Sequence, residues 1–134
     1  MRSLVSRKTM DDFDCAPKAD PHANGTIWAA ALWDLRTTLG RSGDRDAKKC
    51  DLLVLKTLLG IGQVTAETNR NTRRMRTDYS QAAAALLRAD EALYAGKYRD
   101  LIVACLSSRK IAVAVERVSN APNLLLSWEK GCPA

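Results

Sequence analysis

Histidine is nearly absent from this chain of 134 residues. The single one, His22, cannot form a two-histidine metal motif by itself. Glycine and proline are also scarce, with seven and four residues, which excludes collagen-like and loop-dominated folds. No apolar run approaches the roughly 18–20 residues that cross a bilayer, so no membrane-spanning segment is expected. Residues 1–8 lack an apolar centre, and we do not expect them to act as a secretory signal.

Aromatic residues are few: three Trp, three Tyr and one Phe. Hydrophobic residues nevertheless make up 46% of the chain, and most of them are Ala and Leu. This balance favours helices over a β-sandwich or barrel, which would need more β-branched and aromatic residues. Since the length suits one domain, we predict an all-α fold: a compact bundle of about four helices with an extended C-terminal tail.

Apolar periodicity predicts the first helix over residues 26–39, with Asn24 as its N-cap and Gly40 at its C-terminal end. This helix is apolar almost all round, which is typical of a central, buried element. Its main apolar positions recur at spacings of three and four: Trp28, Leu32, Leu35 and Leu39.

A second helix is predicted from Asp44 to Leu59, ended by Gly60 and Gly62. We expect its packed stripe to consist of Leu52, Leu55 and Leu59. Residues 63–77 are polar and are predicted to form a surface loop, which carries Arg70, Arg73, Arg74 and Arg76.

A third helix should begin after Thr77 or Asp78 and close at Gly96, and a fourth should follow from Tyr98. The third packs through Ala82, Leu86, Ala89 and Leu93, and the fourth through Leu101, Ile102 and Cys105. After Lys110 the alternation of Ile111, Val113 and Val115 indicates a short strand or extended arm, and residues 124–128 form a last apolar cluster. We therefore divide the chain into an extended segment (1–21), a helical lobe (22–110) and an extended tail (111–134).

The net charge of +6 is concentrated in one stretch. Residues 41–76 carry nine basic and four acidic residues, whereas the signs nearly balance elsewhere. Such a patch attracts phosphates, and it is also typical of a solvated basic loop.

The four cysteines, Cys15, Cys50, Cys105 and Cys132, include no C-x-x-C pair, which argues against a structural zinc site or a redox motif. Two long-range disulfides and four buried thiols both remain open, and four cysteines allow three pairings.

Four segments of the chain resemble, in order, the C-terminal part of the fungalysin family of secreted, thermolysin-like zinc metallopeptidases. The first is HANGTIWAAALWDL at residues 22–35, and the second is CDLLVL at 50–55. The third is YSQAAAALLRADEALYAG at 79–96, and the last combines LIV at 101–103 with Arg109 and Lys110. The resemblance covers residues 20–111.

The resemblance implies a helical lobe that follows the zinc-binding part of the enzyme. In the family, an H-E-x-x-H helix and a downstream glutamate hold zinc and activate water, and this chain has one histidine and no such helix. Zinc is therefore expected only if a complementary lobe is present. The family's lobe supplies a histidine that donates a hydrogen bond to the oxyanion, and His22 matches that position. Asp20 is the expected acidic partner of His22. Without the resemblance, His22 reads as an exposed turn residue.

The same resemblance implies further site residues. Thr26 and Trp28 would border the substrate cleft, although the residue pattern favours a core position for Trp28 over a substrate contact. It also implies a Cys105–Cys132 disulfide, which leaves Cys15–Cys50 as the second pair, and an extracellular location.

Three functions follow as hypotheses. The first is the C-terminal lobe of a fungalysin-like endopeptidase, inactive alone and acting on peptides once completed by its partner lobe. The second is a non-catalytic interaction or structural module derived from that lobe, which would self-associate or bind a partner. The third, suggested only by the basic stretch, is a helical protein that binds nucleic acid; no aromatic residue interleaves its arginines.

Overall fold

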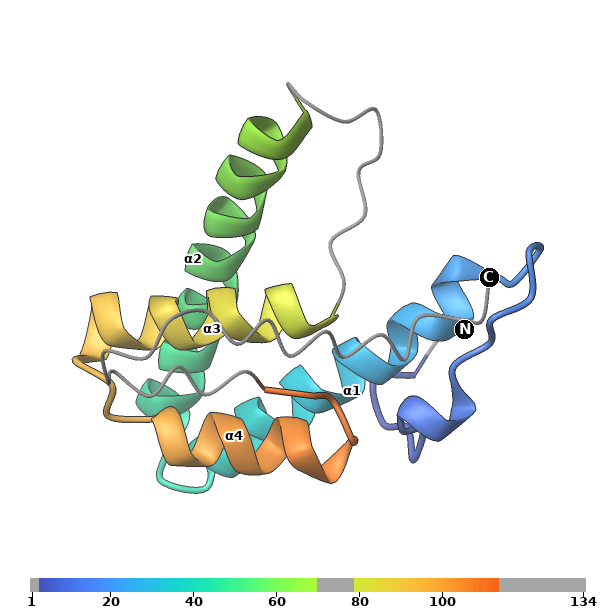
Figure 1. Ribbon diagram of the computed structural model, residues 1–134. Coiled ribbons are helices and arrows are strands. Elements are labelled where there is room, and N and C mark those ends of the chain that lie inside the picture. The colour runs from blue at the N-terminus through green and yellow to red at the C-terminus, as the bar shows by residue number, and fades with distance from the viewer. Residues whose placement is uncertain (1–2, 70–78, 114–134) are drawn as a thin grey trace, which may run out of the picture.

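The computed structural model of this chain describes residues 3–69 and 79–113, with side chains described throughout except in 62–69. These residues form a short 3-10 helix, η1 (Met10–Asp12), and the helices α1 (Pro21–Gly40), α2 (Asp44–Asn69), α3 (Tyr79–Tyr94) and α4 (Arg99–Ser108). The described residues contain no strand. The predicted all-α bundle is therefore confirmed (Figure 1).

Helix α1 buries one face rather than its whole circumference, so the prediction of a helix buried almost all round is confirmed only for that face, and Leu32 and Trp33 are half-buried. Helices α2 and α4 both pack against it, and α3 packs against α2 and α4 (Figure 1). Burying each Leu or Ile side chain contributes roughly 1.5–3 kcal/mol, and α1 shares this core with the other three helices. The buried apolar residues of α1 are Ile27, Ala30, Ala31, Leu35 and Leu39.

The packed face of α2 differs from the predicted one. Leu52, Leu55 and Leu59 are all more than half exposed, so the predicted stripe is wrong. The buried face consists instead of Ala47, Cys50, Leu53 and Thr57. Three of these four side chains are small and let the neighbouring helices approach closely: a Cβ at Gly40 would lie 3.4 Å from that of Ala47. The bulk of this part of the core comes from leucines of the neighbouring helices.

Helix α2 is also longer than predicted, because it continues through Gly60 and Gly62 to Asn69. A glycine inside a helix costs only about 1 kcal/mol relative to alanine. It ends a helix where the backbone must turn left-handed, and both Gly60 and Gly62 instead lie within α2.

The third and fourth helices pack as predicted through Ala82, Leu86, Ala89, Ile102 and Cys105, all of which are buried. Leu93 and Leu101 lie at the edge of the core, where Leu93 is exposed and Leu101 half-buried.

The turn between α3 and α4 is built around Gly96 and a buried carboxylate. Gly96 closes α3 with a φ of +74°, and a Cβ there would come within 2.7 Å of the Glu91 carboxylate. Both oxygens of the fully buried Asp90 accept the N–H of Tyr98, at 3.2 and 3.1 Å. Asp90 thereby fixes the start of α4, which has no side-chain cap of its own.

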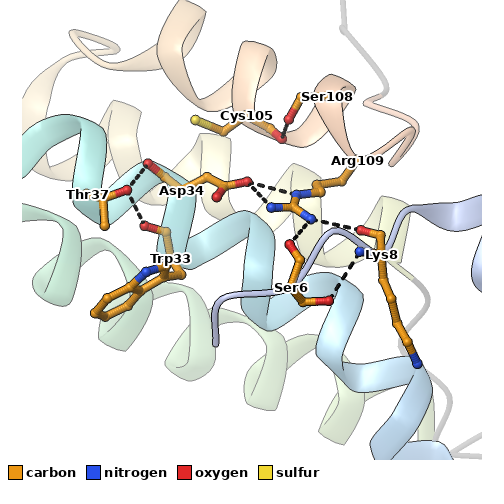
Figure 2. Close-up of polar contacts among 8 residues, drawn as sticks. All are labelled: Ser6, Lys8, Trp33, Asp34, Thr37, Cys105, Ser108 and Arg109. Atoms are coloured by element: carbon orange, nitrogen blue, oxygen red, sulfur yellow. Dashed lines mark hydrogen bonds and ion pairs between the residues drawn. The ribbon is translucent and has the colours of Figure 1, made fainter. Parts of the chain in front are cut away.

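Arg109 attaches the N-terminal segment to the bundle (Figure 2). Its Nε donates to the Asp34 carboxylate on α1 at 2.8 Å. A terminal nitrogen of the same guanidinium donates to the main-chain carbonyls of Ser6 and Lys8. The carbonyl of Arg109 in turn accepts the N–H of Met10 at 3.0 Å. One side chain thus joins α1, the end of α4 and the N-terminal segment.

Other predictions concern the ends of the described regions. Residues 111–113 form no strand, and Ile111 is buried against the core. Val115, the apolar cluster at 124–128, the helix-capping residues Thr77 and Asp78 and the arginines of 70–76 lie outside the described residues.

Replacing Arg109 tests its role as the attachment point. Arg109→Ala should lower the free energy of unfolding by about 2–4 kcal/mol, because it leaves Asp34 and two carbonyls without their donor. Arg109→Lys should recover less than half of this loss, since an ammonium is a single point donor. Denaturant unfolding measures both. As a control, Lys110→Ala removes an exposed ion pair with Asp11 and should cost under about 1 kcal/mol. Equal effects of Arg109→Ala and Lys110→Ala would contradict this role.

Asp90 should make stability depend on pH. Burial raises the pKa of the Asp90 carboxyl, so the folded state holds its proton more tightly than the unfolded state. Stability is therefore lost as pH rises from about 3.9, the unfolded pKa, through the folded pKa. Asp90→Asn keeps an acceptor for the Tyr98 N–H and removes the titration.

Urea unfolding between pH 4 and pH 7 measures this difference. The free energy of unfolding of Asp90→Asn, minus that of the unmodified chain, should increase as the pH rises from 4 to 7. Asp90→Ala, which removes the acceptor, should lower the free energy of unfolding by about 1–3 kcal/mol. A difference between Asp90→Asn and the unmodified chain that stays constant with pH would contradict this account.

Candidate functional site

The first turns of α1 hold the residues for which the sequence predicts a function. The helix begins at Pro21, five residues earlier than predicted, and Asp20 is its N-cap. The Asp20 carboxylate accepts the main-chain N–H of His22 at 2.9 Å. Aspartate followed by proline is a recognised helix start, so the sequence contained the signal for this boundary.

His22 lies on the first turn of α1, and its side chain is exposed. Its expected partner does not hold the ring, because the carboxylate of Asp20 caps the main chain. The carboxylate of Asp14, the other nearby acid, accepts the N–H of Ala16 at 2.9 Å. The imidazole makes no hydrogen bond to any residue in the described part of the chain. It is therefore positioned by its helix and free to meet a ligand from solvent.

Asn24 is not the predicted N-cap but a buried link between three segments. Its side-chain amide accepts the N–H and donates to the carbonyl of Asp14, both at 2.8 Å. Its own carbonyl accepts the hydroxyl of Tyr79 at 2.6 Å. Asn24 thus fixes the first turn of α1 against the N-terminal segment and α3. Sequence reasoning missed this role, since no local pattern reports contacts 10 and 55 residues away.

Thr26 and Trp28 occupy different sides of α1. Thr26 lies four residues after His22 and shares its side of the helix, with its hydroxyl donating to the Ala23 carbonyl at 2.6 Å. Gly25 lies beside them, and a Cβ there would contact nothing. His22, Gly25 and Thr26 therefore form an open surface at the helix start.

Trp28 belongs to an aromatic cluster. Its ring stacks on Tyr79 at 6.0 Å between centroids, and Phe13 meets Tyr79 edge-on at 6.0 Å. Burial raises the pKa of the Tyr79 hydroxyl. These contacts place Trp28 at the edge of the core, where it supports the turn that carries His22.

The cysteines do not form the pairs that the resemblance implies. Cys50 and Cys105 are buried free thiols, so neither Cys15–Cys50 nor Cys105–Cys132 is present. Cys15 is bonded in a disulfide, and Cys132 lies outside the described residues. Burial raises the pKa of the Cys50 thiol to about 11 and also raises that of Cys105. Because the thiolate is the reactive form, both cysteines are inert packing residues.

Zinc does not fit the described residues. No group of three His, Cys, Asp or Glu side chains among them lies close enough to hold a metal ion, and His22 is the only histidine in the chain. The described part of the chain also contains no helix long and apolar enough to span a membrane. The chemistry available at the start of α1 is that of one exposed imidazole on a fixed helical turn.

No family model, curated protein or solved structure matches this chain.

Variants at the start of α1 separate its architecture from its surface chemistry. Asp20→Ala should lower the free energy of unfolding by about 1 kcal/mol, because the N-cap acceptor is lost, whereas Asp20→Asn should keep most of it. His22→Ala removes only an exposed side chain and should change stability by less than about 0.5 kcal/mol. Thermal unfolding followed by circular dichroism measures all three. A large loss in His22→Ala would show that the ring is structural and would contradict this description.

Proposed function

We propose that this chain is the C-terminal lobe of a fungalysin-like zinc metalloendopeptidase and that it supplies a wall of the substrate cleft. The observation that carries the proposal is the setting of His22: an exposed imidazole on the capped first turn of α1. Asp20, Pro21 and Asn24 hold that turn in place. The order of the four segments resembling the family adds support.

In this proposal the imidazole of His22 donates a hydrogen bond to the oxyanion that forms when the peptide carbonyl is attacked. A preorganised donor of this kind contributes roughly 3 kcal/mol in the transition state. The helical turn provides the preorganisation, because its main chain is capped and its neighbour Asn24 is buried. Thr26 and Gly25 would line the cleft beside the donor. Asp20 then acts through the helix cap rather than by holding the ring.

The metal has to come from elsewhere. Since the described residues do not fit zinc, the metal and the water it activates would belong to a complementary lobe, and this chain alone should be inactive. An extracellular location belongs to the same proposal, as it does for the secreted family.

A second function is favoured by a different observation. Leu52, Leu55, Leu58 and Leu59 are exposed together on α2, as expected of a lobe that has become a non-catalytic interaction module. Binding to nucleic acid has less support, because four of the nine basic residues in the stretch that suggested it, those of 70–76, lie outside the described residues.

Reconstitution tests the leading proposal. A fungalysin-family peptidase from which the C-terminal lobe has been removed supplies the zinc-binding part, and this chain is added to it. We expect peptide cleavage that a chelator abolishes. His22→Ala should lower kcat by about 10²–10³-fold with little change in KM, because the hydrogen bond strengthens in the transition state.

Two controls make the result decisive. The peptidase's own lobe, added back separately, must restore activity, and Lys18→Ala, a change at another exposed residue, should behave like the unmodified chain. The proposal would be refuted if this chain cleaved peptides alone, or if it failed to restore activity where the peptidase's own lobe restores it. It would also be refuted if His22→Ala restored activity as well as the unmodified chain does.

A further inference from the structure

Helix α2 carries a compact apolar surface that no described residue covers. It consists of Leu52, Leu55, Leu58 and Leu59, which are between 54% and 68% exposed, and we call these four residues the leucine face. Their spacing places them on one side of two helical turns. The opposite side, with Leu53 and Thr57, is buried in the bundle. Single exposed leucines are ordinary on a protein surface, but four adjacent ones mark an interaction site.

The spacing of this surface matches a helical partner. Leu52, Leu55 and Leu59 follow one another at three and four residues, which is the seam of apolar side chains that a second helix covers with knobs-into-holes packing. Leu58 widens the seam on one side. The Arg36–Asp51 ion pair, at 2.8 Å, joins α1 to α2 next to it.

The surroundings of the leucine face are positively charged. Arg45, Lys48 and Lys56 are exposed on the same side of α2, and none forms an ion pair with a carboxylate in the described regions. Asp44 is the exposed acid on this side. The carboxylate of Asp51 is already paired with Arg36. Among the described side chains on this side of α2, three unpaired cations therefore lie near one unpaired carboxylate beside the apolar seam.

We propose that the leucine face docks an amphipathic helix of another protein, with apolar residues along its seam and acidic residues on its flanks. Charge complementarity favours such a partner, because acidic flanks meet the three cations. A second copy of this chain would bring the same excess of cations to the same seam. The leucine face is also separate from the start of α1, because Arg36 lies fourteen positions after His22, about 21 Å along the helix. The proposal therefore does not rest on a catalytic role for His22.

Two designed peptides test the proposal with the full chain. Both have three heptads with leucine at the seam positions; one carries glutamate at the flanking positions and the other lysine. We expect the labelled acidic peptide to bind in fluorescence anisotropy and the basic peptide to bind at least about tenfold more weakly. Raising the salt from 50 to 500 mM should weaken the acidic complex by about threefold or more.

Variants locate the binding surface. Leu55→Gln should weaken binding of the acidic peptide by about tenfold or more, and Lys56→Gln by about threefold. Leu93→Gln removes an exposed leucine from α3 and should bind normally. Glutamine is nearly as good a helix former as leucine, and thermal unfolding verifies that each variant is folded.

Several outcomes would overturn the proposal. These are failure of the acidic peptide to bind, equal binding of both peptides, or equal loss in Leu55→Gln and Leu93→Gln. Self-association in sedimentation that Leu55→Gln abolishes would instead assign the surface to a second copy. Co-sedimentation with phosphatidylglycerol vesicles that depends on Leu55, without peptide binding, would assign it to anionic lipid.

Discussion

The burial of α1 is the constraint on which the rest of the structure depends. The buried face of α1 runs from Ile27 to Leu39 and its other apolar residues are half-buried, so other elements must cover it from more than one side. Helices α2 and α4 pack directly on it, and α3 covers it through Tyr79, whose ring stacks on Trp28. The same constraint explains why small residues line the packed face of α2. Since α2 approaches closely, only Leu53 of its leucines is buried and the other four are left outside, so the leucine face results from how the core is packed.

Polar contacts then fix the two ends of this apolar centre. At one end Asn24 joins α1 to the N-terminal segment and to Tyr79 on α3. Nearer the other end Arg109 joins Asp34 on α1 to the main chain of residues 6 and 8. At both sites, buried or half-buried polar groups form hydrogen bonds with residues distant in the sequence. Such contacts select one packing of the helices over others that would bury a similar apolar surface. The consequence for function is that the turn carrying His22 is held from two directions while its imidazole remains exposed.

The parts of this structure that sequence reasoning predicted are those that local physics determines. The central helix follows from its periodicity, and the end of α3 follows from Gly96. The predicted start of α1 is wrong because Asn24 also has the side chain of an N-cap, whereas the Asp20–Pro21 pair marks the true start. The face of α2 could not be read locally, because its leucines occur on both sides and the choice depends on how closely α1 and α3 approach. At the candidate site, the exposure of His22 fits the sequence interpretation. The predicted contact between the Asp20 carboxylate and the His22 ring is absent, because Asp20 caps the main chain of α1 instead. The contacts of Asn24, which hold the turn, involve residues distant in the sequence.

The central claim, that His22 belongs to a peptidase lobe completed by a separate zinc-binding part, is tested most directly by the transcript sequence upstream of the Met1 codon. The account predicts a coding segment for an H-E-x-x-H helix, in frame with this chain or in the adjacent reading frame. A transcript with an in-frame stop upstream and no such segment in a neighbouring reading frame would contradict it. The leucine face, rather than His22, would then be the place to look for this protein's function.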